Sequence, residues 1–355
     1  MRFLFLLIPA LTLLAFVGSE GKGHLEPYEF KIPRGFTPMP VSEDNTVTVE
    51  GAELGRFLFY DPILSRDSSI SCATCHKQEY AFSDGGKKFS VGVNGDSTRR
   101  NTPPLFNLAW YPAMFWDGRA KSIEDQVFFP VRDHSEMDLD WLEVEKRLNR
   151  SSFYKPKFKL VFQSSSIDSM MVAMAIGQFE RTLISGDSKL DKVVRGEAKF
   201  TLQELRGFEI MNDQSMGDCL HCHPTDAHLM GSSFKFSNNG IEPITNWEDY
   251  PDKGLGEISG LEKDMGRFKI PTIRNVGVTG PYMHDGRFET LEEVVDFYSE
   301  GLNHSPNIDS RMTRVKQGGV HLSEEDKAAV VAYLHCLTDS TFLTKEEFSN
   351  PFLTY

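Results

Sequence analysis

The stretch that decides the fold is SCATCH, residues 71–76, together with its second copy, DCLHCH, residues 218–223. Each contains Cys-x-x-Cys-His, a spacing typical of covalent attachment of a c-type haem. The two thiols bond to the vinyl groups of the porphyrin, and the adjacent histidine becomes the proximal ligand of the iron. Two copies predict two covalently bound haems c, held by the following residues: Cys72, Cys75 and His76 for the first, and Cys219, Cys222 and His223 for the second.

Two other uses of paired cysteines fit these motifs less well. A zinc site would need further paired ligands at metal spacing, and a redox dithiol would need a βαβ context. Four of the five cysteines fall within the two motifs, each followed directly by histidine, so haem attachment is favoured. The remaining cysteine, Cys336, lies in an apolar helical run and is interpreted as a buried structural residue.

The N-terminus has the composition of an export signal. An apolar run covers residues 3–17 after Met1 and Arg2, and small residues follow it. The run is shorter than the roughly 20 residues that span a bilayer, so we expect a signal peptide, residues 1–19, rather than a retained anchor. A periplasmic location follows, and it suits haem attachment outside the cytoplasm.

Net charge limits the partners of the chain. The formal charge of -13 argues against nucleic acid. An acidic surface could steer a basic electron-donor protein, although in secreted proteins it more often maintains solubility. The full chain has 355 residues. What remains after removal of the signal peptide is still long enough for two domains with their own cores.

An internal duplication organises the chain. Residues 102–119 align without a gap on residues 270–287, and the alignment continues from 122–125 to 290–293. Each haem motif is therefore followed by a Pro-x-Leu/Ile-x-Asn pattern, an Asp-Gly-Arg triplet and a helix start that Ser122 or Thr290 can cap. Few segments alternate with the period of a strand, so the predicted fold class is mainly α.

The periodicity and the duplication also predict elements and boundaries. Helices are expected at residues 51–60, 169–185 and 323–338, the last starting in a pattern like a capping box, and an irregular loop is expected at 82–104. The duplication places a boundary near Gly186. The predicted units are residues 20–186 and residues 187–340, followed by a C-terminal tail, residues 341–355.

The repeat distinguishes the two irons. Tyr298 in the second copy aligns with Pro130 in the first. Tyrosine can ligate iron and proline has no donor side chain, so the second haem would be closed and the first left open to a small oxidant. Tyr298 could instead be a core aromatic residue, with Met283, Met265 or Met312 as the ligand, and the residues alone leave these alternatives open.

Several motifs resemble those of the bacterial dihaem cytochrome c peroxidase superfamily, which includes the methylamine-utilisation enzyme MauG. Besides the first haem motif, they are RNTP at 100–103, FWDGRA at 115–120, EM at 136–137 and PYMHDG at 281–286. They occur in order over essentially the whole mature chain. The resemblance implies two tandem cytochrome c-like domains, with a peroxidatic haem in the first and an electron-entry haem in the second.

The resemblance also implies roles for single residues. Glu136 matches the distal glutamate, which can move a proton between the two oxygens of a peroxide. Gln126 matches the distal glutamine, which would orient the peroxide. Trp116 matches the tryptophan between the two haems, where it would relay electrons, although a lone tryptophan beside Phe115 is more often a packing residue and could serve both roles.

Two positions match the MauG-like branch rather than typical peroxidases. Tyr298 stands where typical peroxidases have methionine, and Val93 stands where they have a histidine that blocks the first iron until reduction releases it. We therefore expect no need for reductive activation. The family also binds calcium at the junction of its domains.

Calcium prefers oxygen ligands, and the positions that match the family site are Asn101, Thr279 and Pro281. Together, the motifs predict an exported dihaem peroxidase that reduces hydrogen peroxide with electrons from a small cytochrome c or copper protein. One alternative is a MauG-like oxidation of a side chain in a partner protein. Another is a dihaem electron carrier without catalysis, which would need two six-coordinate irons. Members of the family often pair, so a homodimer is a further expectation.

Overall fold

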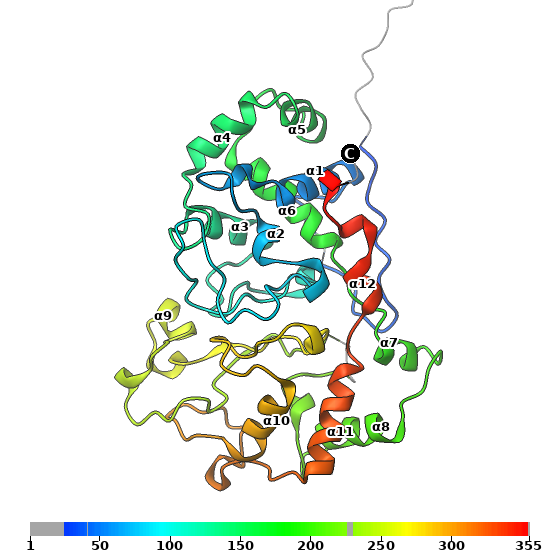
Figure 1. Ribbon diagram of the computed structural model, residues 1–355, viewed down its shortest axis with the longest axis vertical. Helices are drawn as coiled ribbons and strands as arrows, with labels where there is room; N and C mark the ends of the chain where they lie inside the picture. The colour runs from blue at the N-terminus through cyan, green and yellow to red at the C-terminus, as the bar shows by residue number, and fades with distance from the viewer. Residues whose placement is uncertain (1–24, 41, 226–229, 354–355) are drawn as a thin grey trace, which may run out of the picture.

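The computed structural model describes residues 25–40, 42–225 and 230–353 (Figure 1). The fold is mainly helical, as the sequence predicts. Its one regular sheet within the described ranges pairs β1 (Phe236–Ser237) with β2 (Phe268–Lys269) in antiparallel register. The predicted signal peptide, residues 1–19, lies outside the described residues, and none of the described helices is long and apolar enough to cross a bilayer.

The first half of the chain is built around a close pair of helices. Its helices are α1 (Val49–Tyr60), α2 (Cys72–Cys75), α3 (Ile123–Arg132), α4 (Trp141–Arg150), α5 (Tyr154–Phe162) and α6 (Ser169–Thr182). Gly55 of α1 lies so close to α6 that a Cβ there would stand 1.9 Å from the carbonyl oxygen of Ala175. Helix α6 ends before residue 185, the predicted end, because the carbonyl of Leu183 accepts a hydrogen bond from the backbone of Asn107 instead.

The second half has a similar pair, α8 and α11. Its helices are α7 (Lys189–Val194), α8 (Leu202–Asn212), α9 (Leu255–Ser259), α10 (Leu291–Glu300), α11 (Glu324–His335) and α12 (Ser340–Thr344). Gly207 of α8 approaches the carbonyl oxygen of Ala329 in α11 as closely as Gly55 approaches α6. Ser323 caps α11 by accepting a hydrogen bond from the backbone of Asp326 at 3.2 Å, which is one half of the predicted capping box.

The duplication seen in the sequence is present in the backbone. Asn107 and Asn275 are repeat-equivalent, and both adopt the left-handed conformation, with φ of 54° and 55°. The side-chain oxygen of Asn107 accepts from the backbone of Ser185 at 2.9 Å, and that of Asn275 accepts from the backbone of Asp339 at 2.8 Å. In both copies, therefore, an asparagine in the same conformation binds the backbone that follows the last long helix of that copy. Ser122 and Thr290 cap α3 and α10 as predicted.

The two halves meet through equivalent residues. The backbone N–H of Lys269 donates to the carbonyl of Trp116 at 2.7 Å, and that of Asn101 donates to the carbonyl of His284 at 2.8 Å. Lys269 is the repeat-equivalent of Asn101, and His284 is that of Trp116. The contact is thus reciprocal, with the first half above the second in Figure 1.

The C-terminal segment returns to the first half. Phe342 of α12 packs on Phe82 and Phe106, with ring centroids 5.7 Å apart in each case, and Phe348 belongs to the same apolar core. In Figure 1 this segment runs along the side of the first half. The predicted loop at 82–104 contains no helix or strand, and every residue in it is described. The boundary near Gly186 remains a prediction.

Replacement of Asn275 by alanine should destabilise the protein strongly. Asn275 is fully buried, and its side chain also donates to Ser185 Oγ at 3.0 Å. The change removes two buried hydrogen bonds and places alanine in a left-handed conformation, so we expect a loss of about 2–4 kcal/mol in the free energy of unfolding. Urea unfolding of the holoprotein measures it. The exposed Asn212→Ala is the control, and an equal effect of both changes would contradict this account.

Candidate active site

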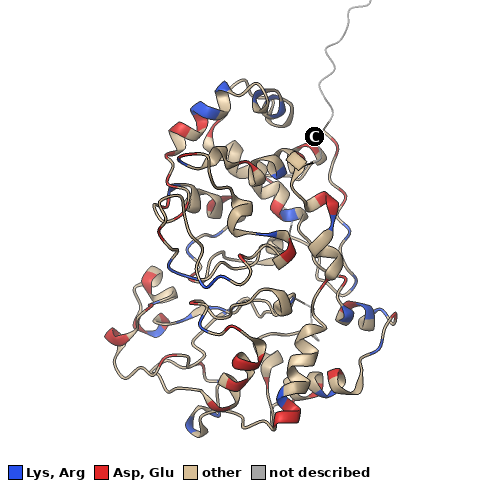
Figure 2. Ribbon diagram, in the orientation of Figure 1, with Lys and Arg blue, Asp and Glu red and all other residues tan. Residues whose placement is uncertain are grey.

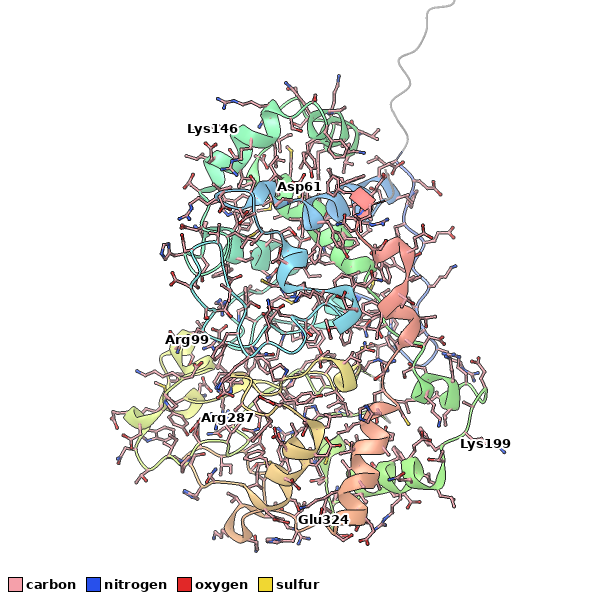
Figure 3. The ribbon with its side chains drawn as sticks, in the orientation of Figure 1. Asp61, Arg99, Lys146, Lys199, Arg287 and Glu324 are labelled. Carbon is pink, nitrogen blue, oxygen red and sulfur yellow. The ribbon has the colours of Figure 1, made fainter. Side chains whose placement is uncertain are left out.

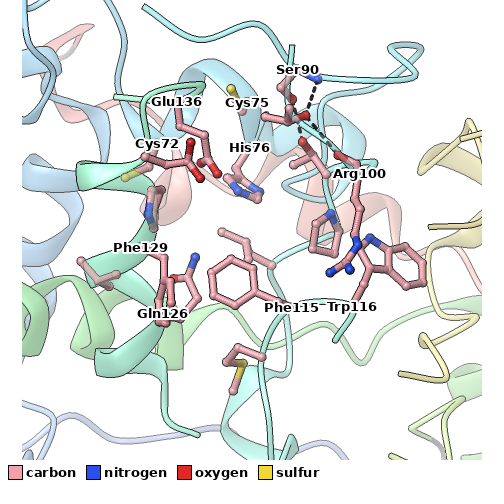
Figure 4. A pocket seen from close by; sticks show the side chains of 18 of the residues that line it. Cys72, Cys75, His76, Ser90, Arg100, Phe115, Trp116, Gln126, Phe129 and Glu136 are labelled. Atoms are coloured by element: carbon pink, nitrogen blue, oxygen red, sulfur yellow. Dashed lines mark hydrogen bonds between the residues drawn. The ribbon is translucent and has the colours of Figure 1, made fainter. Parts of the chain in front are cut away.

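A cavity of about 380 Å³ opens in the first half (Figure 4). Its volume is in the range of sites that hold a prosthetic group or small ligand. Cys72, Cys75 and His76 form one part of the wall, and Trp116, Gln126 and Glu136 form others. The structure therefore brings the first haem motif and all three predicted catalytic residues to one cavity.

The first motif is prepared for a haem. Cys72 and Cys75 are free thiols rather than a disulfide. The backbone N–H of Ser71 donates to Thr74 Oγ1 at 2.9 Å, which fixes the start of the short helix α2. His76 Nδ1 lies 2.7 Å from the carbonyl oxygen of Phe82, so this nitrogen carries the proton and Nε2 keeps its lone pair for iron.

Burial supports the same role for His76. Transfer away from water disfavours the imidazolium form and lowers the pKa of His76 to about 4. The ring is therefore neutral at physiological pH, as an iron ligand must be. The donor set of the first motif fits a covalent haem c.

The second motif repeats this arrangement. Cys219 and Cys222 are also free thiols. His223 Nδ1 lies 2.9 Å from the carbonyl oxygen of Pro271 and 3.3 Å from that of Gly231, which again leaves Nε2 for the metal. Burial lowers the pKa of His223. The second motif therefore fits a haem as well.

Helix α3 supplies the opposite wall of the first cavity. Gln126, Phe129 and Pro130 line the cavity, and they share one face of the helix because they are spaced by three and four residues. Pro130 is the repeat-equivalent of Tyr298 and brings no donor atom to this wall. Figure 4 shows the amide of Gln126 reaching into the cavity from α3.

Glu136 follows α3 and reaches into the same cavity (Figure 4). Its backbone carbonyl accepts from the N–H of Val93 at 2.8 Å, which ties it to the loop that the sequence predicts to be irregular. Burial raises the pKa of Glu136 to about 7, with a further increase from Asp133 and an opposing effect of the Arg119 guanidinium. Such a carboxyl can accept and return a proton near neutral pH.

The loop that carries Val93 brings no side-chain donor to the cavity at that position. Val91 and Gly92 of this loop line the wall, and Val93 itself has no atom that could bind iron. Two thioethers, Met114 and Met137, are also part of the wall, but each is only 4% exposed and packs in the apolar core of the first half.

Trp116 lies where the halves meet. Its indole Nε1 donates to the backbone carbonyl of Asn101 at 2.8 Å, and its own carbonyl accepts from Lys269 of β2 at 2.7 Å. The ring lines the cavity of the first half, while the backbone is bonded to the second half. This position suits a residue between two redox centres.

An ion-pair network connects arginines in the cavity wall with carboxylates of both halves. Arg100 pairs with the buried Asp117 at 2.5 Å and with Asp252 at 2.7 Å. Arg99, labelled in Figure 3, pairs with Glu257 of α9 at 2.7 Å. Asp252 and Glu257 lie in the segment that lengthens the second copy, and Glu257 and Ile258 of this segment are part of the cavity wall.

Tyr298 lies near the second haem motif. Its hydroxyl is 3.0 Å from Asn239 Nδ2, and burial raises its pKa to about 12, helped by the thiols of Cys222 and Cys219. The sulfur of Met283 lies 3.8 Å from the same Asn239 nitrogen. The structure therefore brings two of the four candidate ligands, Tyr298 and Met283, to the same asparagine.

The remaining predicted residues are a candidate iron ligand, Met312, the calcium positions and Cys336. Met312 shares an apolar cluster with Tyr298. Asn101 donates to the carbonyls of Lys87 and Lys88, both at 3.2 Å, and the neighbouring Gly86 donates to the carbonyl of Gly280, between Thr279 and Pro281. The calcium site stays a prediction. Among the described residues, no group of three or more His, Cys, Asp or Glu side chains could hold a metal ion. Cys336 is buried, in line with a structural role.

Sequence reasoning missed two buried ionisable residues in the cavity wall. Glu180 of α6 is 3% exposed, and its Oε2 has no hydrogen-bond partner among the described residues. Lys269 of β2 is 8% exposed. The repeat could have pointed to Lys269, because it is the equivalent of Asn101. Glu180 lies one helical turn after Ile176, another wall residue, so the two share a face of α6.

Comparison with known proteins gives a consistent assignment. Residues 49–199 match the family model of the di-haem cytochrome c peroxidases. The methylamine utilization protein MauG of Methylophilus methylotrophus is 31% identical over 93% of this chain and 94% of its own length. The cytochrome c551 peroxidase of Nitrosomonas europaea is 34% identical over 72% of this chain and 76% of its own.

Solved structures agree. A MauG-like protein associated with microbial copper homeostasis is 32% identical, with a TM-score of 0.80 over 92% of this chain and 99% of that one. The diheme peroxidase BthA of Burkholderia thailandensis, at 21% identity and a TM-score of 0.72 over 88% of this chain and 91% of that one, shares the fold. Because these likenesses extend over nearly the whole chain and both haem motifs are intact, the chain belongs to the dihaem cytochrome c peroxidase family, whose members are haem-dependent oxidoreductases.

Proposed function

We propose that this protein reduces hydrogen peroxide to two waters in the cavity beside His76, consuming two electrons and two protons. Electrons would come from a small donor protein, enter at the haem of His223 and pass by way of Trp116. The observation that carries the proposal is the meeting of Glu136 and Gln126 with His76 in one cavity.

The haem bound at His76 would supply the iron that binds and reduces peroxide. The protein's own residues manage the protons. Glu136 as carboxylate accepts a proton from one peroxide oxygen and returns it to the other, the leaving oxygen. The amide of Gln126 orients the peroxide by hydrogen bonding. Both side chains reach into the cavity from α3 and the segment after it.

A second candidate is oxidation of a side chain in a partner protein. It is supported by the 31% identity to a MauG over almost the whole chain and by the hydroxyl of Tyr298 beside the second haem motif. In that case Trp116 would carry oxidising equivalents away from the cavity. A non-catalytic carrier would need a ligand on the open face of the first iron, and the two thioethers of the wall, Met114 and Met137, are packed in the apolar core instead.

Location and partners are part of the proposal. We place the protein in the periplasm after removal of residues 1–19, with calcium bound near Asn101 and a homodimer as the assembly. Figure 2 shows acidic and basic residues interspersed over both halves in that view, so charge alone does not mark a docking face there. Peroxide turnover can be measured with a small cytochrome c, a copper protein or a candidate substrate protein in turn. The protein that supports turnover identifies either the electron donor or the oxidised substrate.

The resting oxidised protein should contain one high-spin and one low-spin haem. The first iron would have an open face, whereas the second would have a ligand on each side. The EPR spectrum before any reduction measures this. Two low-spin signals would favour the carrier, because a ligand would then occupy the open face of the first iron.

Glu136→Gln should lower the second-order rate of peroxide consumption by about 10²–10⁴-fold while leaving haem content intact, because the amide cannot accept the proton. Stopped-flow mixing with peroxide measures the rate. Glu79→Gln, at an exposed position of the first half, is the matched control and should react like the parent protein. Full activity of Glu136→Gln would remove this residue from the mechanism.

The same rate should depend on pH. The base is the charged form of Glu136, and its pKa is about 7, so the rate should rise with pH below 7 and level off above it. The residual rate of Glu136→Gln should lack this rise. An identical pH profile in both proteins would assign the titration to another group.

Tyr298→Phe should alter the low-spin EPR signal, because phenylalanine cannot bind iron. Met283→Leu is the matched change at the other candidate ligand beside Asn239 and should leave that signal in place. The reverse pattern would give the ligand role to Met283.

A further inference from the structure

Lys269 is a charged residue from the second half in the wall of the first cavity. It lies on β2, is 8% exposed, and its backbone is bonded to Trp116. Its Nζ lies 3.3 Å from the carbonyl oxygen of Ala113 and 4.7 Å from the centroid of the Tyr111 ring. These are weak contacts for a buried ammonium group, which has three N–H donors.

Among the described residues, no carboxylate forms an ion pair with Lys269 Nζ. Asp117 is near enough to favour the charged form, but its oxygens are engaged by Arg100 at 2.5 Å and Arg119 at 2.9 Å. A buried charge without a partner is costly, so the site is suited to an anion that enters the cavity.

The ammonium form is still available. Burial lowers the pKa of Lys269 to about 8, and the charge of Asp117 opposes this shift. Most molecules therefore carry the charge at neutral pH. A bound anion would stabilise it further.

The place of Lys269 indicates which anion it meets. A haem c is attached through its vinyl edge, and its two propionate carboxylates leave from the opposite edge. In Figure 4 Cys72 lies on one side of the cavity and Trp116 on the other. The backbone of Lys269 is hydrogen-bonded to that of Trp116, so this backbone lies on the side of the cavity away from Cys72, and the side chain lines the wall.

We propose that the Lys269 ammonium pairs with a propionate carboxylate of the haem held at His76. The inference rests on the proposed attachment of that haem. A strand of the second half would then hold the haem of the first half directly, beside the tryptophan between the two centres. The positive charge also stabilises reduced iron, which carries one positive charge less, and so raises the reduction potential of this haem.

Lys269→Met in the holoprotein tests the pairing without peroxide. Loss of the hydrogen bond should shift the propionate bending band in the resonance Raman spectrum to lower frequency. Loss of the charge should lower the midpoint potential of the first haem in a redox titration. Lys253→Met, which removes an exposed lysine of the second half, is the matched control and should change neither.

Two conservative variants guard against a merely structural effect. Lys269→Arg should keep the band and the potential close to those of the parent protein. Lys269→Gln keeps a hydrogen-bond donor without charge, so it should lower the potential with a smaller shift of the band.

An unshifted band in Lys269→Met and Lys269→Gln, with both haems attached, would overturn the pairing even if the potential changed. Absence of covalent haem at the first motif in the parent protein would overturn the attachment at His76 instead. Mass spectrometry of the intact chain distinguishes these two failures.

Discussion

The reciprocal pair of backbone hydrogen bonds, Lys269 to Trp116 and Asn101 to His284, is the constraint on which the site depends. It joins equivalent residues of the two copies, so one contact geometry is used twice. As a result, Trp116 has its ring in the first cavity and its backbone on the second half. The wall of one proposed haem site is thus completed by the other copy.

The two copies share this contact geometry but differ in the side chains at two repeat-equivalent positions beside the haem motifs. Pro130 offers no donor to the first cavity, whereas its equivalent, Tyr298, lies beside the second haem motif. Trp116 is replaced in the second copy by His284, which is stacked on Phe268 with ring centroids 3.7 Å apart. Burial lowers the pKa of His284 to about 4, so it is a neutral, buried residue.

The sequence predicts features that depend on neighbouring residues, and it misses those that depend on distant ones. Motif spacing identified both thiol pairs and their histidines, and Ser122 was recognisable as a cap from its place before α3. By contrast, Arg100 meets Asp252 across 152 residues of chain. Lys269 became visible as a cavity residue only when β2 was placed beside Trp116. No local pattern specifies such contacts, because they are created when the two copies pack.

The buried ionisable groups of the wall would couple a bound haem to this packing. Glu180 and Lys269 are both nearly excluded from water, and neither has a full set of protein partners among the described residues. Buried polar groups of this kind are costly unless a ligand satisfies them. A covalently held porphyrin with its carboxylates would provide a partner for the lysine and apolar contact for the remaining wall. Since Lys269 belongs to the second half, filling the first cavity would also strengthen the contact between the halves, and loss of either would weaken the other.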